Sequence, residues 1–303
     1  MEIPSTIIPI TEILVNKNIQ LFIKREDLIH PEISGNKYWK LFYNIKNYLS
    51  QNPKKPQLIT FGGAFSNHIA ATAALANDLN IPSLGIIRGE ELVDKWQENP
   101  TLSLAHTKGM DFRFVTRTQY RDKEILSKDI SNEYPEALIV PEGGTNSLAV
   151  NGIQHMLNNE TKYFDYLCTA VGTGGTLSGI VKYSEEHQKS IGFKAVDDPT
   201  LCDRIIQLSG KENFVLMDAH DGRYGIINDE LIRFINDFQE KYNIPLDPVY
   251  TGKMMKKIFE LIDQNYFPKD SKILAFHTGG LQGISGANEM LIKQNRLTIN
   301  CKI

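Results

Sequence analysis

The sequence of 303 residues has only three cysteines, no long apolar run and no concentrated positive charge. Cys168, Cys202 and Cys301 lie far apart along the chain, which fits a reducing compartment such as the cytoplasm better than a disulfide framework. Because no CxxC or HExxH pair occurs, a structural zinc site is not expected. The segment Met1 to Pro4 shows no basic start followed by an apolar stretch, so we expect no secretory signal.

The charge and apolar content exclude further classes of protein. The formal net charge is −3 at pH 7, and no block of lysine and arginine stands out. Nucleic acid and anionic membrane surfaces are therefore not expected as partners. The longest apolar stretches are strand-sized, so no membrane-spanning helix is expected. Hydrophobic residues make up 41% of the chain, which allows a substantial core in about two domains.

Strand-like and helix-like segments alternate along most of the chain, which predicts an α/β fold with parallel sheets covered by helices on both faces. The predicted strands are 21–26, 57–61, 82–88, 112–115, 137–140, 166–171, 213–217 and 272–276. The predicted helices are 36–49, 66–79, 147–158, 176–187, 229–241 and 253–264. Candidate boundaries near residues 51 and 146 predict a small domain of residues 52–146. Residues 1–51 and 147–303 would together form the larger domain.

Two lysines open the predicted helix of residues 36–49, directly after Gly35. Lys37 and Lys40 lie about 60° apart around the helix, at roughly 100° per residue, so both can reach one ligand near its N-terminus. One amine can form a Schiff base with a carbonyl cofactor, and the other can bind a phosphate. Most helix lysines are solvated, so the helix alone leaves that simpler interpretation open.

A glycine-rich turn separates the strand of residues 166–171 from the next helix, and it consists of Gly172, Thr173, Gly174, Gly175 and Thr176. Its amides and hydroxyls can bind an anion, although a simple tight turn or a dinucleotide site is also compatible. The turn matches neither GxxxxGK[ST] nor GxGxxG, which disfavours a nucleoside triphosphate and a nicotinamide cofactor. Asp197 and Asp198 have a spacing that suits a ribose contact, but we prefer a solvated turn there.

A third feature follows the strand of residues 57–61, where a Gly-Gly pair leads into Ser66, Asn67 and His68. Ser66 and Asn67 are ordinary N-cap residues for the helix that follows. Their hydroxyl and amide groups can also contact a ligand, and both interpretations can hold at once. Combined with the two lysines and the glycine-rich turn, this segment predicts a pyridoxal-phosphate enzyme.

The chain as a whole resembles the fold-type II pyridoxal-phosphate family that contains D-cysteine desulfhydrase and 1-aminocyclopropane-1-carboxylate deaminase. Each matching segment is short, but together they keep the family's order and span nearly the whole chain. The segments are 23–27 (IKRED), 34–37 (SGNK), 62–68 (GGAFSNH), 141–146 (PEGGTN), 172–176 (GTGGT), 247–253 (DPVYTGK) and 277–280 (HTGG). The resemblance implies a two-domain fold similar to the β subunit of tryptophan synthase, with the cofactor between the domains.

The resemblance implies roles for the cofactor-binding residues. Lys37 would carry the cofactor as a Schiff base, and Lys40 together with the turn 172–176 would bind the phosphate. Asn67 would donate to the phenolic oxygen of the cofactor. Thr278 would approach the pyridine nitrogen, and a hydroxyl there would leave that nitrogen largely unprotonated, which suits elimination more than transamination.

The resemblance also implies contacts with a small amino-acid substrate. Ser66 would contact the substrate carboxylate or move a proton, with Asn67 and His68 beside it. Tyr250 would pack near the cofactor ring and act in acid–base chemistry, although a core tyrosine is the simpler interpretation of that residue alone. Lys37 is the expected base for the α-proton, and Ser66 or Tyr250 would assist it. A homodimer is expected from the resemblance alone.

Two positions distinguish the family's branches. Desulfhydrases carry threonine at the positions of Thr251 and Thr278, whereas the cyclopropane deaminases carry glutamate and leucine. Thr251, expected beside the substrate, therefore favours D-cysteine desulfhydrase, with 1-aminocyclopropane-1-carboxylate deaminase as the alternative. An alternative of another class is a non-catalytic binder of a small molecule or dinucleotide, which Lys37 disfavours.

Phe65 departs from the family pattern and either lines the pocket or belongs to the core.

Overall fold

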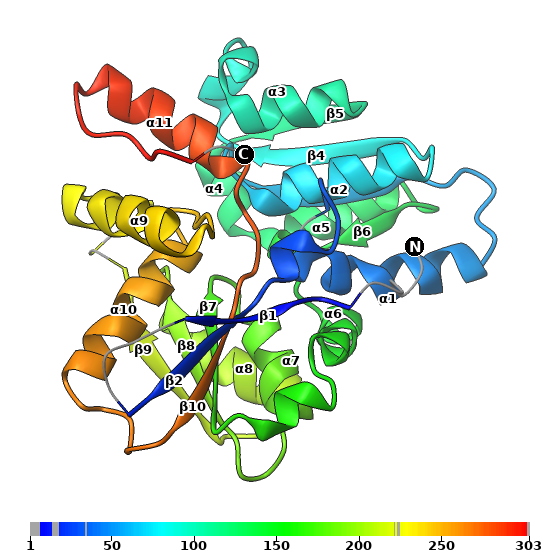
Figure 1. Ribbon diagram of the computed structural model, residues 1–303. Coiled ribbons are helices and arrows are strands. Elements are labelled where there is room, and N and C mark those ends of the chain that lie inside the picture. The colour runs from blue at the N-terminus through cyan, green and yellow to red at the C-terminus, as the bar shows by residue number, and fades with distance from the viewer. Residues whose placement is uncertain (1–6, 14–17, 34, 221, 223–224, 302–303) are drawn as a thin grey trace.

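The computed structural model describes residues 7–13, 18–33, 35–220, 222 and 225–301, and within them the chain forms two sheets packed with helices (Figure 1). The strands are β1 (Ile10–Ile13), β2 (Gln20–Lys24), β3 (Leu58–Gly62), β4 (Ser83–Arg88), β5 (Met110–Val115), β6 (Leu138–Val140), β7 (Tyr166–Val171), β8 (Lys189–Lys194), β9 (Phe214–Asp218) and β10 (Lys272–Phe276). The α-helices are α1 (Asn36–Ser50), α2 (Asn67–Asp78), α3 (Pro100–Thr107), α4 (Arg117–Arg121), α5 (Lys123–Glu133), α6 (Ser147–Ile153), α7 (Gly175–Tyr183), α8 (Leu201–Ser209), α9 (Asp229–Tyr242), α10 (Thr251–Asp263) and α11 (Gly283–Lys293).

The two sheets are almost entirely parallel. The larger sheet has the order β1-β2-β10-β7-β8-β9, and in it only the β1–β2 pair is antiparallel. The smaller sheet has the order β5-β4-β3-β6, with every pair parallel. The predicted α/β class is confirmed. The strands of the smaller sheet all lie between residues 58 and 140, while the division into domains at residues 52–146 stays a prediction.

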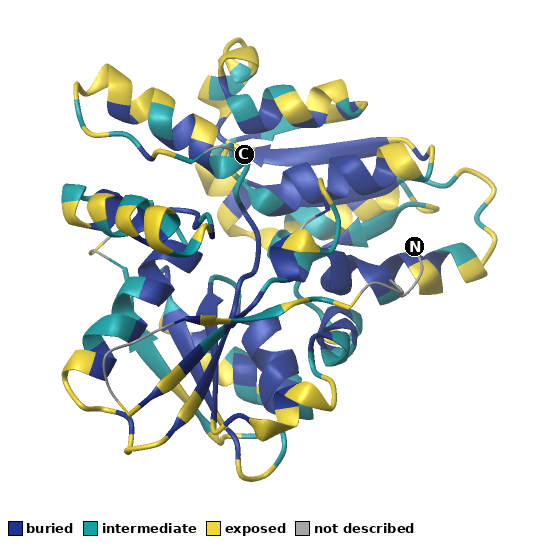
Figure 2. Ribbon diagram, in the orientation of Figure 1, coloured by how far each residue is buried: buried dark blue, intermediate teal, exposed yellow. Residues whose placement is uncertain are grey.

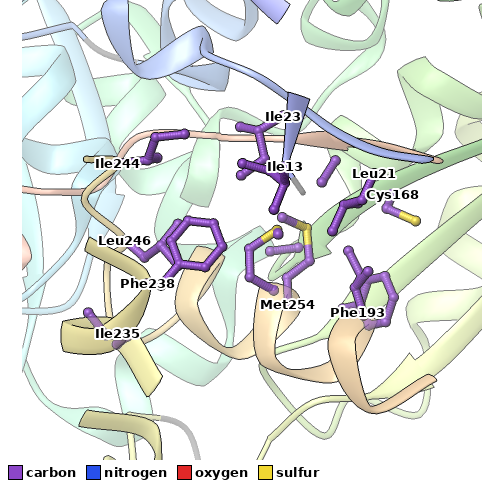
Figure 3. Close-up of a cluster of buried hydrophobic side chains, with 14 of the residues drawn as sticks. Ile13, Leu21, Ile23, Cys168, Phe193, Ile235, Phe238, Ile244, Leu246 and Met254 are labelled. Atoms are coloured by element: carbon purple, nitrogen blue, oxygen red, sulfur yellow. The ribbon is translucent and has the colours of Figure 1, made fainter. Parts of the chain in front are cut away.

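The central strands are apolar because both faces of each sheet are covered. Every residue of β3 and of β7 is buried, as expected for parallel strands that lie between layers of helices. Figure 2 shows the central strands β10, β7 and β8 of the larger sheet as mainly buried, while exposed residues gather on outward faces of helices such as α9. One core cluster packs α9 and α10 against the larger sheet, with Phe238, Met254, Cys168 and Phe193 among its members (Figure 3).

Helix α1 connects the cores of the two sheets. Its apolar stripe is buried at Tyr38, Leu41, Phe42 and Ile45 and partly buried at Leu49. The same cluster contains residues from both sheets: Leu58 of β3, Val140 of β6, Leu167 of β7 and Leu274 of β10. At Gly152 in α6, a β-carbon would clash with the backbone oxygen of Trp39, so glycine allows α6 to approach α1 closely. This packing fixes the first turn of α1, which carries Lys37.

The structure differs from the predicted elements in several places. It adds β1, β8, α3, α4, α5, α8 and α11, and the predicted helix 147–158 is α6 followed by a short 3-10 turn, Gln154–Met156. Gly192 interrupts the apolar pattern of β8. Glycine is needed there because a β-carbon would clash with the side chain of Leu177. Ser34 and the segment Met1 to Pro4 lie outside the described residues. Among the described residues, no helix combines the length and apolar content that crossing a membrane requires.

Candidate active site

A cavity of about 650 Å³ lies where the carboxyl ends of strands from both sheets face each other. This edge of a parallel sheet is the usual position of ligand sites in α/β folds. The cavity brings together every predicted site residue except Thr251. The predicted residues that line it are Lys37, Lys40, Ser66, Asn67, His68, Gly172, Thr173, Gly174, Gly175, Thr176, Tyr250 and Thr278.

Lys37 extends into the cavity from the first turn of α1. Gly35 precedes this turn with φ of +64°, and a β-carbon there would clash with the backbone oxygen of Thr278, so only glycine fits. The Lys37 amine donates to Asn36 Oδ1 at 3.1 Å, and Asn36 donates to Thr176 Oγ1 at 2.6 Å. Burial lowers the pKa of Lys37 to about 8, while the charge of Asp247 acts in the opposite direction. A large neutral fraction near pH 8 makes this amine a competent nucleophile.

Lys40 lies one turn further along α1 and faces the glycine-rich turn. Its buried amine donates to Thr145 Oγ1 at 2.9 Å, and that oxygen lies 2.5 Å from Thr173 Oγ1. A β-carbon on Gly175 would come within 3.1 Å of the Lys40 amine and 2.7 Å of Thr145 Oγ1. Burial and the charge of Lys37 hold the pKa of Lys40 well below its usual range.

These groups fit the phosphate of pyridoxal phosphate. Lys40 is a buried amine that faces hydroxyls rather than a carboxylate, so a bound phosphate would supply the missing counter-charge. The turn 172–176 leads into the N-terminus of α7, where backbone amides and the helix dipole favour an anion. We therefore assign Lys40, Thr145 and this turn to the phosphate as a proposal.

Asn67 and Ser66 lie at the start of α2 on the opposite side of the cavity. Ser66 caps the helix by accepting from the amide of Ile69 at 3.3 Å, as predicted. Asn67 Oδ1 accepts from Gln282 Nε2 at 2.7 Å, which leaves its Nδ2 as the group able to donate. That orientation suits the predicted contact with a phenolic oxygen, and it depends on Gln282, which the sequence analysis missed.

His68 forms part of the cavity wall in its neutral form. The Thr60 hydroxyl donates to the carbonyl of Val140 at 2.9 Å, so His68 Nε2, 2.7 Å from Thr60 Oγ1, must carry the hydrogen. Burial first, and then the charges of Lys37 and Lys40, lower the pKa of His68 well below its usual range. The predicted contact of His68 with substrate stays a prediction.

Asp247 determines how Tyr250 and Thr251 are placed. Its carboxylate accepts from the amides of Val249, Tyr250 and Thr251 at 2.7–2.9 Å and from the Thr251 hydroxyl at 2.7 Å. Tyr250 consequently lies against the backbone of Gly172, where a β-carbon would come within 3.2 Å of the ring. Thr251 is fully buried and does not line the cavity, which differs from the expected substrate contact.

Sequence reasoning missed several residues that line or support the cavity. Phe65, whose place the sequence left open, lines the cavity and is exposed. A β-carbon on Gly286 of α11 would come within 3.1 Å of its ring. Thr145 was part of a matched segment but had no assigned role. Arg88 ends β4 and also lines the cavity. Only the long-range fold brings these residues together, so no local signal could have found Arg88 or Gln282.

The family model described as "Pyridoxal-phosphate dependent enzyme" matches residues 2–279. The chain belongs to this family. The fold-type II architecture, the enzyme class and the cofactor expected from the resemblance are thereby confirmed. A solved structure of an ACC deaminase homologue is 26% identical, with a TM-score of 0.79 over 96% of this chain and 95% of that one.

Curated relatives have two kinds of names. A bifunctional D-cysteine desulfhydrase/1-aminocyclopropane-1-carboxylate deaminase of Arabidopsis thaliana, described as mitochondrial, is 29% identical over 88% of this chain and 73% of its own length. A putative 1-aminocyclopropane-1-carboxylate deaminase of Pyrococcus horikoshii is 29% identical over 87% of this chain and 85% of its own. A D-cysteine desulfhydrase of Serratia proteamaculans is 25% identical over 86% of each chain. These names do not distinguish between the two substrates.

The lowered pKa of Lys37 predicts how the cofactor-free protein captures pyridoxal phosphate. Only the neutral amine attacks the aldehyde, so the second-order capture rate should rise with pH, with a midpoint near 8, and level off above it. Stopped-flow absorbance at the cofactor's visible band measures this rate between pH 6 and 10. The Lys37→Ala protein should lack the phase, and a midpoint above pH 10 would contradict the prediction.

Proposed function

We propose that this enzyme removes a β-substituent from a small amino acid, with D-cysteine as its substrate and pyruvate, ammonia and sulfide as products. The observation that carries the proposal is that Thr278, a residue with a side-chain hydroxyl, lines the cavity. Among the described lining residues, the only carboxylates are Glu142 and Asp198, which are paired with Lys123 and Arg204. A hydroxyl near the pyridine nitrogen favours elimination over chemistry that needs a protonated ring.

Bound pyridoxal phosphate supplies an electron sink for negative charge that develops at the substrate's α-carbon. Lys37 Nζ would hold the cofactor and then, once the substrate amine replaces it, take the α-proton. The β-substituent would leave with its bonding electrons, and water would convert the remaining fragment to pyruvate and ammonia.

The α2 end of the cavity supports binding of the substrate carboxylate. Ser66 Oγ accepts from Ile69, so its own hydrogen is left to donate to a carboxylate at the start of α2. Tyr250, held by Asp247 against Gly172, would restrict the cofactor ring from the other side. We propose these roles for Ser66 and Tyr250 together with a homodimer and a cytoplasmic location, which size-exclusion chromatography and fractionation would test.

A second candidate is 1-aminocyclopropane-1-carboxylate deamination, because several relatives bear that name. The purified enzyme should therefore be assayed with D-cysteine, L-cysteine and 1-aminocyclopropane-1-carboxylate while sulfide and 2-oxo acid are measured. We expect sulfide and pyruvate in equal amounts from D-cysteine, with kcat/KM at least about 10-fold above that for the cyclopropane, a difference of roughly 1.4 kcal/mol. 2-Oxobutyrate as the main product would contradict the proposal and favour the second candidate.

A further inference from the structure

Arg88 lines the cavity without a role in the chemistry described above. It is the last residue of β4, and Gly62 of the neighbouring strand β3 pairs with Ile87 directly before it. A β-carbon on Gly63 would lie 3.4 Å from Arg88 Nη2, so the guanidinium lies directly over the loop that leads to Ser66. The Tyr120 ring supports the guanidinium from another side, with 5.7 Å between the guanidinium carbon and the ring centroid.

The Arg88 guanidinium has no ion-pair partner within the described residues, although the Glu91 carboxylate lies near it. The pKa of Glu91 is lowered first by its hydrogen bond to Arg117 and, in smaller part, by the charge of Arg88. Glu142 forms its ion pair with Lys123, and Glu91 forms its ion pair with Arg117. Arg88 itself is exposed on the cavity side and forms no ion pair within the part of the chain that the structure describes. An oriented guanidinium in a concave site is suited to binding a planar or tetrahedral anion.

The other anions expected in the cavity have binding groups elsewhere. Lys40, Thr145 and the turn 172–176 fit the cofactor phosphate, and the start of α2 with Ser66 fits the substrate's α-carboxylate. Among the described residues, five lysine or arginine side chains but only two carboxylates line the cavity, although the whole chain carries a net charge of −3. The two ion pairs and the phosphate site account for Lys123, Arg204 and Lys40. Because Lys37 would hold the cofactor, Arg88 is the lining cation that remains.

We propose that Arg88 forms a subsite for an anionic group on the β-carbon of the substrate, so the enzyme prefers amino acids whose β-substituent is negatively charged. The inference rests on the proposed function, since it names the substrate class of that same site. The thiolate of D-cysteine belongs to this class, as do amino acids with a β-phosphate, β-sulfonate or β-carboxylate. Arg88 would also stabilise charge that grows on the β-substituent as it leaves.

The step balances without an oxidant or reductant. For a phosphorylated serine, the α-carbon–hydrogen bond breaks and Lys37 Nζ takes the proton. The β-carbon–oxygen bond breaks, inorganic phosphate leaves with the bonding electrons, and a carbon–carbon double bond forms. Water then replaces the nitrogen, so the products are pyruvate, ammonia and phosphate.

Binding to the holoenzyme tests the subsite without turnover. Aspartate and asparagine have nearly the same shape and differ in charge at the position that Arg88 would contact. By isothermal titration calorimetry with both enantiomers, the wild type should bind aspartate more tightly than asparagine. Arg88→Gln should raise the Kd for aspartate about 10- to 100-fold and change the Kd for asparagine less than about 3-fold. Arg88→Lys, which keeps the charge, should retain part of the preference.

The matched control is Arg121→Gln, an exposed arginine of α4 that does not line the cavity. It should leave both Kd values unchanged. An equal loss for aspartate and asparagine in Arg88→Gln would place Arg88 at the α-carboxylate and overturn the proposal. An unchanged Kd for aspartate in Arg88→Gln would also overturn it.

A turnover assay separates failure of the subsite from failure of the proposed function. O-phosphoserine and β-chloroalanine both have good β leaving groups, but only the phosphate is anionic before it leaves. Arg88→Gln should lower kcat/KM for O-phosphoserine about 10- to 100-fold and leave β-chloroalanine nearly unchanged. If the wild type turns over β-chloroalanine but shows no preference for an anionic β-substituent, the proposed function remains intact and the subsite is refuted. If neither O-phosphoserine nor β-chloroalanine is turned over, but aspartate binding still depends on Arg88, elimination is refuted and the subsite is supported.

Discussion

Replacing Lys37 by alanine should lower kcat/KM for any substrate of this enzyme by at least about 10³-fold. The expected loss is large because one amine would both hold the cofactor and take the α-proton, and general-base catalysis alone is typically worth about 10²–10⁴-fold. Thermal unfolding of the cofactor-free protein should change little, because within the described part of the chain the Lys37 amine donates only to its neighbour Asn36. Sulfide release and 2-oxo acid formation from the substrate that the wild type prefers measure the loss.

Two controls distinguish a chemical role of Lys37 from a structural one. Lys46→Ala changes an exposed lysine on the same helix and should leave kcat/KM unchanged. Added methylamine should partly restore turnover in Lys37→Ala, because the site would again contain an amine. Pyridoxal phosphate should still bind to Lys37→Ala without a covalent bond, since Lys40 and the turn 172–176 remain. Activity of Lys37→Ala within about 10-fold of the wild type would contradict both proposed roles.

The fold was predictable wherever a local apolar pattern determined an element. Strand β7 is a continuous apolar run that is buried throughout, and its predicted range agrees with the structure. Strand β8 was missed because it owes its position to packing against Leu177 and to pairing with β7 rather than to its own composition. Helix α11 was missed because Gly283 and Gly286 weaken its pattern, although α3 and Phe65 pack against it.

The site was predictable where chemistry and backbone geometry lie in one segment. Gly35 and Lys37 illustrate this, since a positive φ before a helix places the amine of the next turn. Thr251 shows the opposite case, because the carboxylate of Asp247 binds its hydroxyl and removes it from the cavity wall. The placement of Arg88 beside the loop of Ser66 depends on the register between β3 and β4, which no short segment encodes.

Replacing Lys40 by methionine should weaken cofactor binding while it stabilises the cofactor-free protein. A charged contact to phosphate is worth roughly 1.5–3 kcal/mol, so we expect the Kd for pyridoxal phosphate to rise about 10- to 100-fold. Without the phosphate, the buried amine lacks a counter-charge, and burial lowers its pKa well below 10.5. Methionine fills a similar volume without this desolvation cost, so the cofactor-free variant should gain roughly 1 kcal/mol or more at pH 7.

The pH dependence of that gain follows from the direction of the pKa shift. The unfolded chain holds the Lys40 proton up to pH near 10.5, whereas the folded, cofactor-free protein releases it at lower pH. The wild type should therefore become more stable as pH rises through this window, and the advantage of Lys40→Met should shrink. Urea unfolding of the cofactor-free proteins at pH 7 and 10 measures this, with Lys46→Met as the control on the same helix. A constant difference between the two pH values, or a destabilised Lys40→Met at pH 7, would show that the Lys40 amine is already compensated without a phosphate.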